Sequence, residues 1–285
     1  MKCDAANPKA SGPVNIWQET FPVRFGAIDR SDRLTLNAAL QFFQEAAICH
    51  AENLLVGRED MARTGQVWIL SRMSVMADRR PKYGETITVR SWPRGGEKLF
   101  AIRDYDIRDK DDIPVVSARS GWLIVDIEKR RPLRPQSVMG SLPGNEGLNA
   151  LTSGPAGLEE RGILQTDVSS GANPLCVKTE RRALYNDVDY NGHVNNVSYI
   201  KWIEDVIDPR CLEQAEKMRL DINYMNEILA GETINLAYAP LETEDKNITA
   251  FAFEGRKTEN SQSAAPTGSA APAGCAFRAE LRLWV

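Results

Sequence analysis

The chain has 285 residues, of which 42% are hydrophobic and 26% charged, and its formal net charge is -4 at pH 7. A chain of this length suits one large domain or two smaller ones, and its apolar content is enough to fill a core. The mild acidity gives no general basis for binding nucleic acid or an anionic membrane surface.

Secretion and membrane insertion are also not expected. Segment 1–15 is polar and lacks the apolar centre of a signal peptide, and no apolar run is long enough to span a membrane. The five cysteines lie far apart and form no C-x-x-C pair, and there are only two histidines. We therefore expect reduced thiols in a cytoplasmic protein, with no metal site and no cofactor.

The first predicted elements are a long helix and several antiparallel strands. Apolar residues at 4-3-4 spacing between Leu36 and Ala47 indicate a helix with one buried face. Apolar and polar residues then alternate in 86–90 and 99–108, which predicts strands with one face toward solvent.

The same order returns in the second half of the chain. An apolar stripe from Val197 to Ile207 predicts a second helix, with Asn195 or Asn196 as its N-cap. The clearest strand is 275–284, where every second residue is apolar. A helix packed against a one-sided antiparallel sheet is an α+β arrangement, and we expect one in each half.

Matches between the halves indicate an internal repeat. The sequence Gly-Glu-Thr-Ile occurs at 84–87 and again at 231–234, which is an offset of 147 residues. The segments around the two helices match at an offset of 159. In these frames the polar residues discussed below have the following counterparts: Asp189 with Arg30, Asn191 with Asp32, His193 with Leu34 and Glu227 with Arg80. The second copy is therefore expected to hold the one active site.

We accordingly predict two units joined by a linker. The first unit is 15–134, the linker rich in Gly, Ser and Pro is 135–174, and the second unit is 175–285. Within the second unit, the low-complexity segment 261–274 is predicted to be a flexible loop.

The most informative segment directly precedes the second helix. It reads Asp189-Tyr190-Asn191-Gly192-His193-Val194-Asn195-Asn196-Val197-Ser198-Tyr199-Ile200-Lys201-Trp202. In extended backbone, Asp189, Asn191 and His193 would point to the same side. A carboxylate, a carboxamide and an imidazole beside the positive end of a helix suit attack of water on a carbonyl.

On this motif, the chain resembles the acyl-acyl-carrier-protein thioesterases of plants and bacteria, which are tandem hotdog-fold proteins. The resemblance covers roughly 21–285 outside the two low-complexity stretches. Segments of the first half support it: Gln44-Glu45, His50-Ala51, Trp68-Ile69-Leu70-Ser71-Arg72-Met73 and Arg130-Arg131-Pro132-Leu133.

The resemblance implies two tandem hotdog units, each a long helix packed on an antiparallel sheet, with catalysis in the second and the acyl-chain pocket in the first. It carries over Asp189, Asn191 and His193 as catalytic residues, together with Glu227, which lies three positions after Tyr224. Plant members often have a cysteine directly after this glutamate. Here that residue is Ile228, so no cysteine nucleophile is present at this position.

The expected reaction is hydrolysis of fatty acyl-acyl-carrier-protein, with water activated by His193 and assisted by Asp189, Asn191 and Glu227. Which carboxylate orients the imidazole and which orients the water stays open. Carrier proteins are usually acidic, so two basic clusters are hypothetical docking sites, with solvated loops as the alternative. These clusters are Arg79, Arg80 and Lys82, and Lys129, Arg130 and Arg131.

Two other functions compete with this prediction. One is an acyl-coenzyme A thioesterase of the hotdog superfamily, and the other, less favoured, is a hotdog hydratase or acyl-binding protein. A monomer with its two units paired and a homodimer are both compatible with the sequence. His50 is expected to be a core residue near the end of the first helix, where an imidazole suits the helix dipole.

Overall fold

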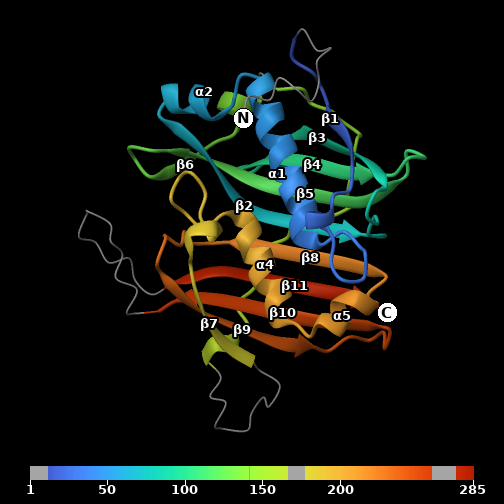
Figure 1. The fold of residues 1–285 in the computed structure, drawn as a ribbon. Coiled ribbons are helices and arrows are strands. Elements are labelled where there is room, and N and C mark those ends of the chain that lie inside the picture. The colour runs from blue at the N-terminus through green and yellow to red at the C-terminus, as the bar shows by residue number, and fades with distance from the viewer. Residues whose placement is uncertain (1–11, 141, 166–176, 259–273) are drawn as a thin grey trace. The chain divides into compact units, whose positions relative to one another are not determined.

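The computed structural model describes residues 12–140, 142–165, 177–258 and 274–285. The chain divides into two compact units, Met1–Ala156 and Gly157–Val285. Figure 1 labels their elements along the chain.

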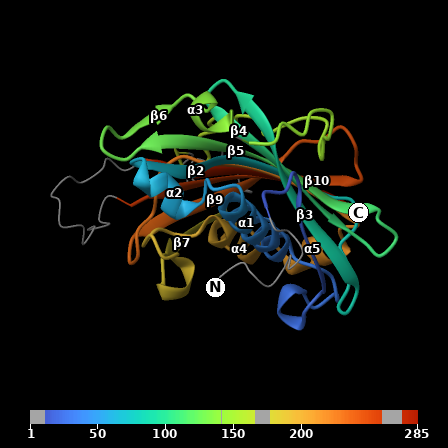
Figure 2. The ribbon, with the colours of Figure 1, turned by 90° about the horizontal axis from the view of Figure 1, so that it is seen from above.

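The first unit is a long helix on an antiparallel sheet. Its elements are β1 (Trp17–Pro22), a 3-10 turn η2 (Phe25–Ala27), α1 (Leu36–Asn53), α2 (Arg58–Arg63), β2 (Gln66–Ala77), β3 (Thr86–Glu97), β4 (Phe100–Arg108), β5 (Pro114–Asp126), β6 (Arg131–Leu133) and α3 (Gln136–Met139). The strands pair in the order β1-β3-β4-β5-β2, with β6 beside β5. Helix α1 contacts β1, β3 and β4, and Figure 2 shows α1 and α3 on opposite sides of the strands β4 and β5.

The second unit repeats this plan. Its elements are η3 (Ile163–Gln165), β7 (Val177–Arg182), η5 (Tyr185–Asp187), α4 (Asn196–Val206), α5 (Pro209–Gln214), β8 (Lys217–Tyr224), β9 (Thr233–Leu241), β10 (Ile248–Lys257) and β11 (Cys275–Trp284). The strands pair in the order β8-β11-β10-β9-β7, all antiparallel. The predicted α+β class is therefore confirmed.

The predicted apolar stripes form the contact between each helix and its sheet. On α1, the buried residues include Leu36, Leu40, Phe43 and Ala47. On α4, Ile200 and Ile203 of the predicted stripe are buried, as is Ile207 directly after the helix. The adjacent Tyr199 packs its ring against that of Phe277 on β11, with 5.2 Å between ring centroids. Because burial follows the helical period, these helices could be predicted from the sequence.

The repeat is visible in the structure, but one predicted offset is wrong. Strands β1 and β7, turns η2 and η5, and the first residues of α1 and α4 are all separated by 160 residues, not 159. At an offset of 160, the stripe residues Leu40, Phe43 and Ala47 match Ile200, Ile203 and Ile207. At 159 they match Tyr199, Trp202 and Val206, which are also apolar, so hydrophobicity alone did not separate the two offsets. The counterparts of Asp189, Asn191 and His193 are therefore Asp29, Ser31 and Arg33.

The 147-residue frame agrees with the strand pairing. Isolated bridges join Arg33 to Lys82 in the first unit and His193 to Leu229 in the second. Lys82 and Leu229 are 147 residues apart, so Arg80 remains the counterpart of Glu227.

Part of the segment predicted as a linker lies against the first unit. The indole N–H of Trp92 donates to the carbonyl of Leu148 at 3.0 Å, and the N–H of Ala150 donates to the Asp104 carboxylate at 2.8 Å. Segment 142–156 is therefore bound to this sheet. Residues 166–174 of the predicted linker and 261–273 of the predicted flexible loop lie outside the described residues.

Cysteine and membrane predictions have different outcomes. Among the described cysteines, Cys211 and Cys275 are free, whereas Cys49 is disulfide-bonded. The prediction of reduced thiols is wrong for Cys49, because wide spacing in sequence does not prevent pairing in the fold. No helix in the described part of the chain is long and apolar enough to cross a membrane.

Candidate active site

A tight turn carries three of the predicted catalytic residues. Val188 and Val194 form an antiparallel bridge, and inside it the N–H of Asp189 donates to the carbonyl of His193 at 2.8 Å. The N–H of Gly192 donates back to Asp189 at 3.0 Å, and Gly192 has φ +79°. The predicted extended backbone is wrong here, because a glycine in the left-handed region lets the chain reverse.

The Asp189 carboxylate holds this turn. Its Oδ1 accepts the N–H of Asn191 at 2.8 Å, and its Oδ2 lies 3.4 Å from the Asn191 side-chain nitrogen. An aspartate that accepts the amide two residues later is a common turn device. Asp189 therefore positions Asn191.

His193 faces the other predicted carboxylate. Its Nε2 lies 3.2 Å from Oε2 of Glu227, with 42% of the His193 side chain and 63% of the Glu227 side chain exposed. Glu227 lies on the loop between β8 and β9, and the N–H of Val194 donates to Ile228 of that loop at 2.7 Å. The structure thus brings together two pairs, His193 with Glu227 and Asp189 with Asn191.

The turn leads directly into α4. Asn195 is the N-cap, and its side chain accepts the N–H of Val197 at 3.1 Å. The Asp187 carbonyl accepts the N–H of Asn195 at 2.8 Å and the hydroxyl of Ser198 at 2.9 Å. The positive end of the α4 dipole therefore lies beside the turn.

Two tyrosines pack behind the start of the helix. The hydroxyl of Tyr224 donates to the carbonyl of Asn196 at 3.1 Å, and the rings of Tyr224 and Tyr199 are 5.4 Å apart. Burial raises the pKa of Tyr199, and the Glu232 and Glu227 carboxylates raise it further. Burial and Tyr199 raise the pKa of Tyr224. Both tyrosines therefore stay protonated and serve as packing and hydrogen-bonding groups.

The first predicted basic cluster is only partly available for docking. Arg80 is buried, with 3% of its side chain exposed, and its NH1 pairs with Oδ2 of Asp29 at 2.6 Å. Arg79 pairs with Glu85 at 2.8 Å and Asp109 at 3.3 Å. Lys82 is exposed. Arg80 cannot contact a partner from this position, because the position equivalent to Glu227 faces into the first unit.

The second predicted basic cluster is exposed. Lys129, Arg130 and Arg131 lie at the turn between β5 and β6, and Lys129 pairs with Asp126 at 3.4 Å. Both clusters belong to the first unit and are distinct from the turn that carries His193.

Sequence reasoning missed a buried ion pair behind the site. Nζ of Lys257 lies 2.7 Å from Oε2 of Glu232, and the side chains are only 10% and 4% exposed. Glu232 belongs to the repeated Gly-Glu-Thr-Ile sequence, which could have marked it as structurally important. No sequence pattern marks Lys257 as its partner, because Lys257 lies at the end of β10, far from Glu232 in sequence.

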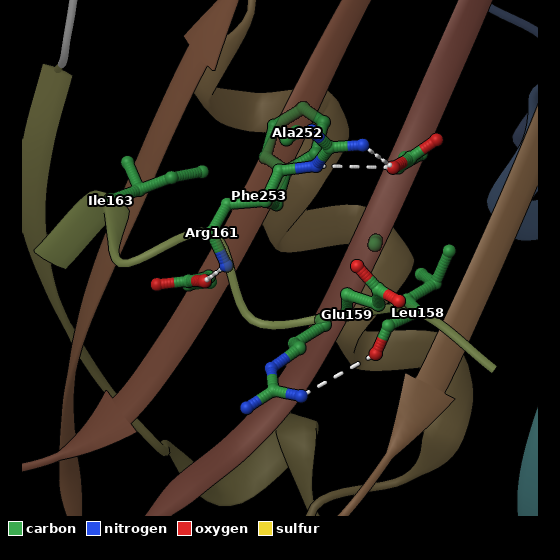
Figure 3. A pocket seen from close by; sticks show the side chains of 10 residues that line it. Leu158, Glu159, Arg161, Ile163, Ala252 and Phe253 are labelled. Atoms are coloured by element: carbon green, nitrogen blue, oxygen red, sulfur yellow. Dashed lines mark hydrogen bonds and ion pairs between the residues drawn. The ribbon is translucent and has the colours of Figure 1, made fainter.

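A separate pocket, lined by both charged and apolar residues, lies where segment 158–163 crosses β10 and β11 (Figure 3). Arg161 reaches Glu280 there, and its N–H donates to Glu254 at 2.7 Å. None of the predicted catalytic residues lines this pocket. The described residues also contain no group of three or more His, Cys, Asp or Glu side chains arranged to hold a metal ion.

Comparison with known families identifies the family of this chain. The family model for the acyl-ACP thioesterase N-terminal domain matches residues 14–138, and that for the C-terminal domain matches residues 177–267. The chain belongs to the acyl-ACP thioesterase family.

Individual members of this family are distant in sequence. A chloroplastic palmitoyl-acyl carrier protein thioesterase of Cuphea hookeriana is 26% identical over 222 residues, which cover 74% of this chain and 52% of the relative. The chain thus spans about half the length of the curated relatives it matches.

Solved structures show the same fold. An acyl-ACP thioesterase from Bacteroides thetaiotaomicron matches with a TM-score of 0.70 at 22% identity, covering 94% of this chain and 97% of that one. The 12:0-ACP thioesterase from Umbellularia californica matches with a TM-score of 0.72 at 19% identity, covering 95% and 98%.

Proposed function

We propose that the chain hydrolyses the thioester of fatty acyl-acyl-carrier-protein, releasing the free fatty acid and ending chain elongation. The observation that carries this proposal is the 3.2 Å contact of His193 with Glu227 beside the start of α4, in a chain of this family. With 42% and 63% of their side chains exposed, His193 and Glu227 are both accessible to a substrate.

His193 is assigned as the base that activates water. Nε2–H of the neutral imidazole donates a hydrogen bond to the Glu227 carboxylate, which leaves Nδ1 free to take a proton from water. The water oxygen then bonds to the carbonyl carbon, the carbon–sulfur bond breaks, and the imidazolium returns its proton to the leaving thiolate.

Asn191 and α4 are assigned to the carbonyl oxygen. One N–H of the Asn191 side chain faces Asp189, so the second can donate to the oxygen as negative charge develops on it. The positive end of α4 favours the same charge. Asp189 acts on Asn191, while Glu227 acts on His193.

We further infer two tandem hotdog units, 15–134 and 175–285, with the acyl chain bound in the first and one active site in the second. The shared order of strand, 3-10 turn, tight turn and helix supports the two copies. A monomer with paired units and a homodimer make different predictions for the mass measured by sedimentation. A cytoplasmic location stays a prediction, and cell fractionation tests it.

The exposed basic residues are proposed to dock an acidic carrier protein. They are Lys82, Lys129, Arg130 and Arg131. Arg80 is left out because it is buried, and Arg79 because it is paired with Glu85 and Asp109. Reversing the charge of Lys129 and Arg131 is expected to raise KM for acyl-carrier substrates and to leave KM for small thioesters unchanged. An equal rise for both substrates would remove the docking assignment.

The decisive experiment is thiol release from a panel of acyl-carrier-protein and acyl-coenzyme A esters, with wild type and His193→Ala. We expect faster hydrolysis of the carrier esters and a loss of about 10²-fold or more in the variant. Preference for coenzyme A esters would favour the alternative thioesterase. A folded wild type that hydrolyses neither would favour a hydratase or binding protein.

A further inference from the structure

The loop that carries Glu227 is fixed on both sides by hydrogen bonds to the backbone. On one side, the side-chain amide of Asn226 donates to the carbonyl of Cys275 at 2.7 Å. On the other, the N–H of Val194 donates to the carbonyl of Ile228 at 2.7 Å. The place of the Glu227 carboxylate therefore depends on how firmly this loop is held.

Glu232 fixes the side of the loop that faces His193. It is 4% exposed, and its Oε2 accepts the N–H of Leu229 at 2.8 Å. Leu229 in turn pairs with His193 in an antiparallel bridge. One buried carboxylate thus holds the backbone segment that joins the two members of the His193–Glu227 pair.

Lys257 supplies the charge that lets this carboxylate be buried. Its Nζ lies 2.7 Å from Oε2 of Glu232. The chain is fixed directly after it, because the N–H of Thr258 donates to the carbonyl of Thr233, the neighbour of Glu232, at 3.0 Å. The buried Glu232 carboxylate thus accepts hydrogen bonds from a cation and from a backbone N–H, and these two contacts define its position.

The first unit contains the same turn without a catalytic pair. Glu85, the counterpart of Glu232, accepts the N–H of Lys82 at 2.8 Å. Its cation is the half-exposed Arg79, at 2.8 Å. Because Arg80 stands where the second unit has Glu227, Glu85 has no catalytic pair to align and provides a matched control.

We propose that Glu232, neutralised by Lys257, is a positioning residue that sets Glu227 against His193. The expected effect of Glu232 on kcat rests on the proposed thioesterase function. The expected effect of Glu232 on the environment of the His193 ring does not depend on that function.

Two substitutions separate position from charge. Glu232→Asp keeps the charge beside Lys257 but draws the carboxylate away from Leu229, so kcat should fall about 10- to 100-fold, with KM nearly unchanged. Glu232→Gln keeps an oxygen at the same reach but leaves the buried Lys257 without its carboxylate, so stability should fall while kcat per folded molecule stays within about threefold of wild type. Glu85→Asp makes the same change in the first unit and should leave kcat unchanged.

Ring resonances of histidine provide a readout that needs no substrate. The chain has two histidines, so a His50→Gln variant assigns both rings in an NMR spectrum. At one fixed pH, Glu232→Asp should move the His193 resonance toward its position in Glu227→Gln and leave the His50 resonance in place. Glu85→Asp should move neither.

Three results would overturn the positioning role: an unmoved His193 resonance in Glu232→Asp, an equal loss of kcat in Glu85→Asp, or equal damage in Glu232→Gln and Glu232→Asp. If Glu232→Asp does not fold, Lys257→Met replaces it and should shift the His193 resonance in the same direction. Absence of hydrolysis by wild type would refute the proposed function alone, because the resonances still decide whether Glu232 positions the pair.

Discussion

Asp29 and Arg80 form an ion pair, with 2.6 Å between Oδ2 and NH1, at the positions that Asp189 and Glu227 hold in the second unit. Asp29 holds its turn as Asp189 does, since its Oδ1 accepts the N–H of Ser31 at 2.9 Å. The turn is thus conserved between the units, whereas the group facing it changes from a cation to a carboxylate. In the first unit, Arg80 forms an ion pair with the turn aspartate. In the second unit, Glu227 contacts His193.

Replacing Arg80 by Met should therefore destabilise the first unit without harming catalysis. Loss of the buried guanidinium leaves the Asp29 charge without its cation, and the free energy of unfolding should fall by about 3 kcal/mol. Urea unfolding at pH 7 measures this, and kcat per folded molecule should stay at the wild-type value. Lys82→Met, at an exposed neighbour, should cost less than about 0.5 kcal/mol. A stability loss no larger than that control would show that the pair contributes little.

The sequence predicted what depends on periodic burial. The stripes of α1 and α4 and the alternation of β11 follow from helices and strands that bury one face, so they could be read without the structure. The four residues proposed for catalysis came from the motif and the family resemblance, and the structure places them in two contacting pairs.

What the sequence did not predict depends on single backbone angles and distant contacts. The reversal at Gly192 comes from one residue with φ +79°, which an alternating polar pattern does not reveal. The offset error of one residue arose because apolar residues face the stripe of the first helix in either frame. Lys257 pairs with Glu232 across 25 residues of sequence, and segment 142–156 is held on its sheet by hydrogen bonds to Trp92 and Asp104. No local pattern marks such contacts.

The left-handed glycine of the turn should matter for catalysis. Gly192→Ala introduces a Cβ that meets open space but requires a left-handed backbone, so the variant should lose about 1 kcal/mol of stability. We also expect kcat to fall about 10-fold, because relaxation of the turn would move His193 away from Glu227. Thermal unfolding and thiol release measure the two effects.

Gly65→Ala provides the matched control for this substitution. Gly65 also has a positive φ, +67°, with open space at its Cβ, and it belongs to the first unit. The same loss of stability is expected, with kcat unchanged. Equal effects of the two variants on kcat would refute a specific role for the Gly192 turn.

Buried His50 should make the stability of the protein depend on pH. His50 is fully buried; its Nε2 lies 2.9 Å from the Val14 carbonyl and its Nδ1 lies 3.1 Å from NH1 of Arg103. Burial, reinforced by the positive charge of Arg103, lowers the pKa of His50 from 6.5 to about 4. Between about pH 6.5 and pH 4, His50 is therefore protonated in the unfolded chain but neutral in the folded chain. Protonation of the unfolded chain lowers the free energy of unfolding, so stability falls as the pH drops through this window.

The size of this effect follows from the two pKa values. Between pH 7 and 4.5, the stability of wild type relative to His50→Gln should fall by about 2–3 kcal/mol, since one pKa unit corresponds to about 1.4 kcal/mol. Gln can still donate to Val14 but does not titrate, so subtracting the variant removes the contribution of the carboxylates. Urea unfolding of both proteins at the two pH values gives the difference. A constant difference would mean that His50 protonates as readily in the folded chain as in the unfolded one, and the buried contact with Arg103 would then not exist in solution.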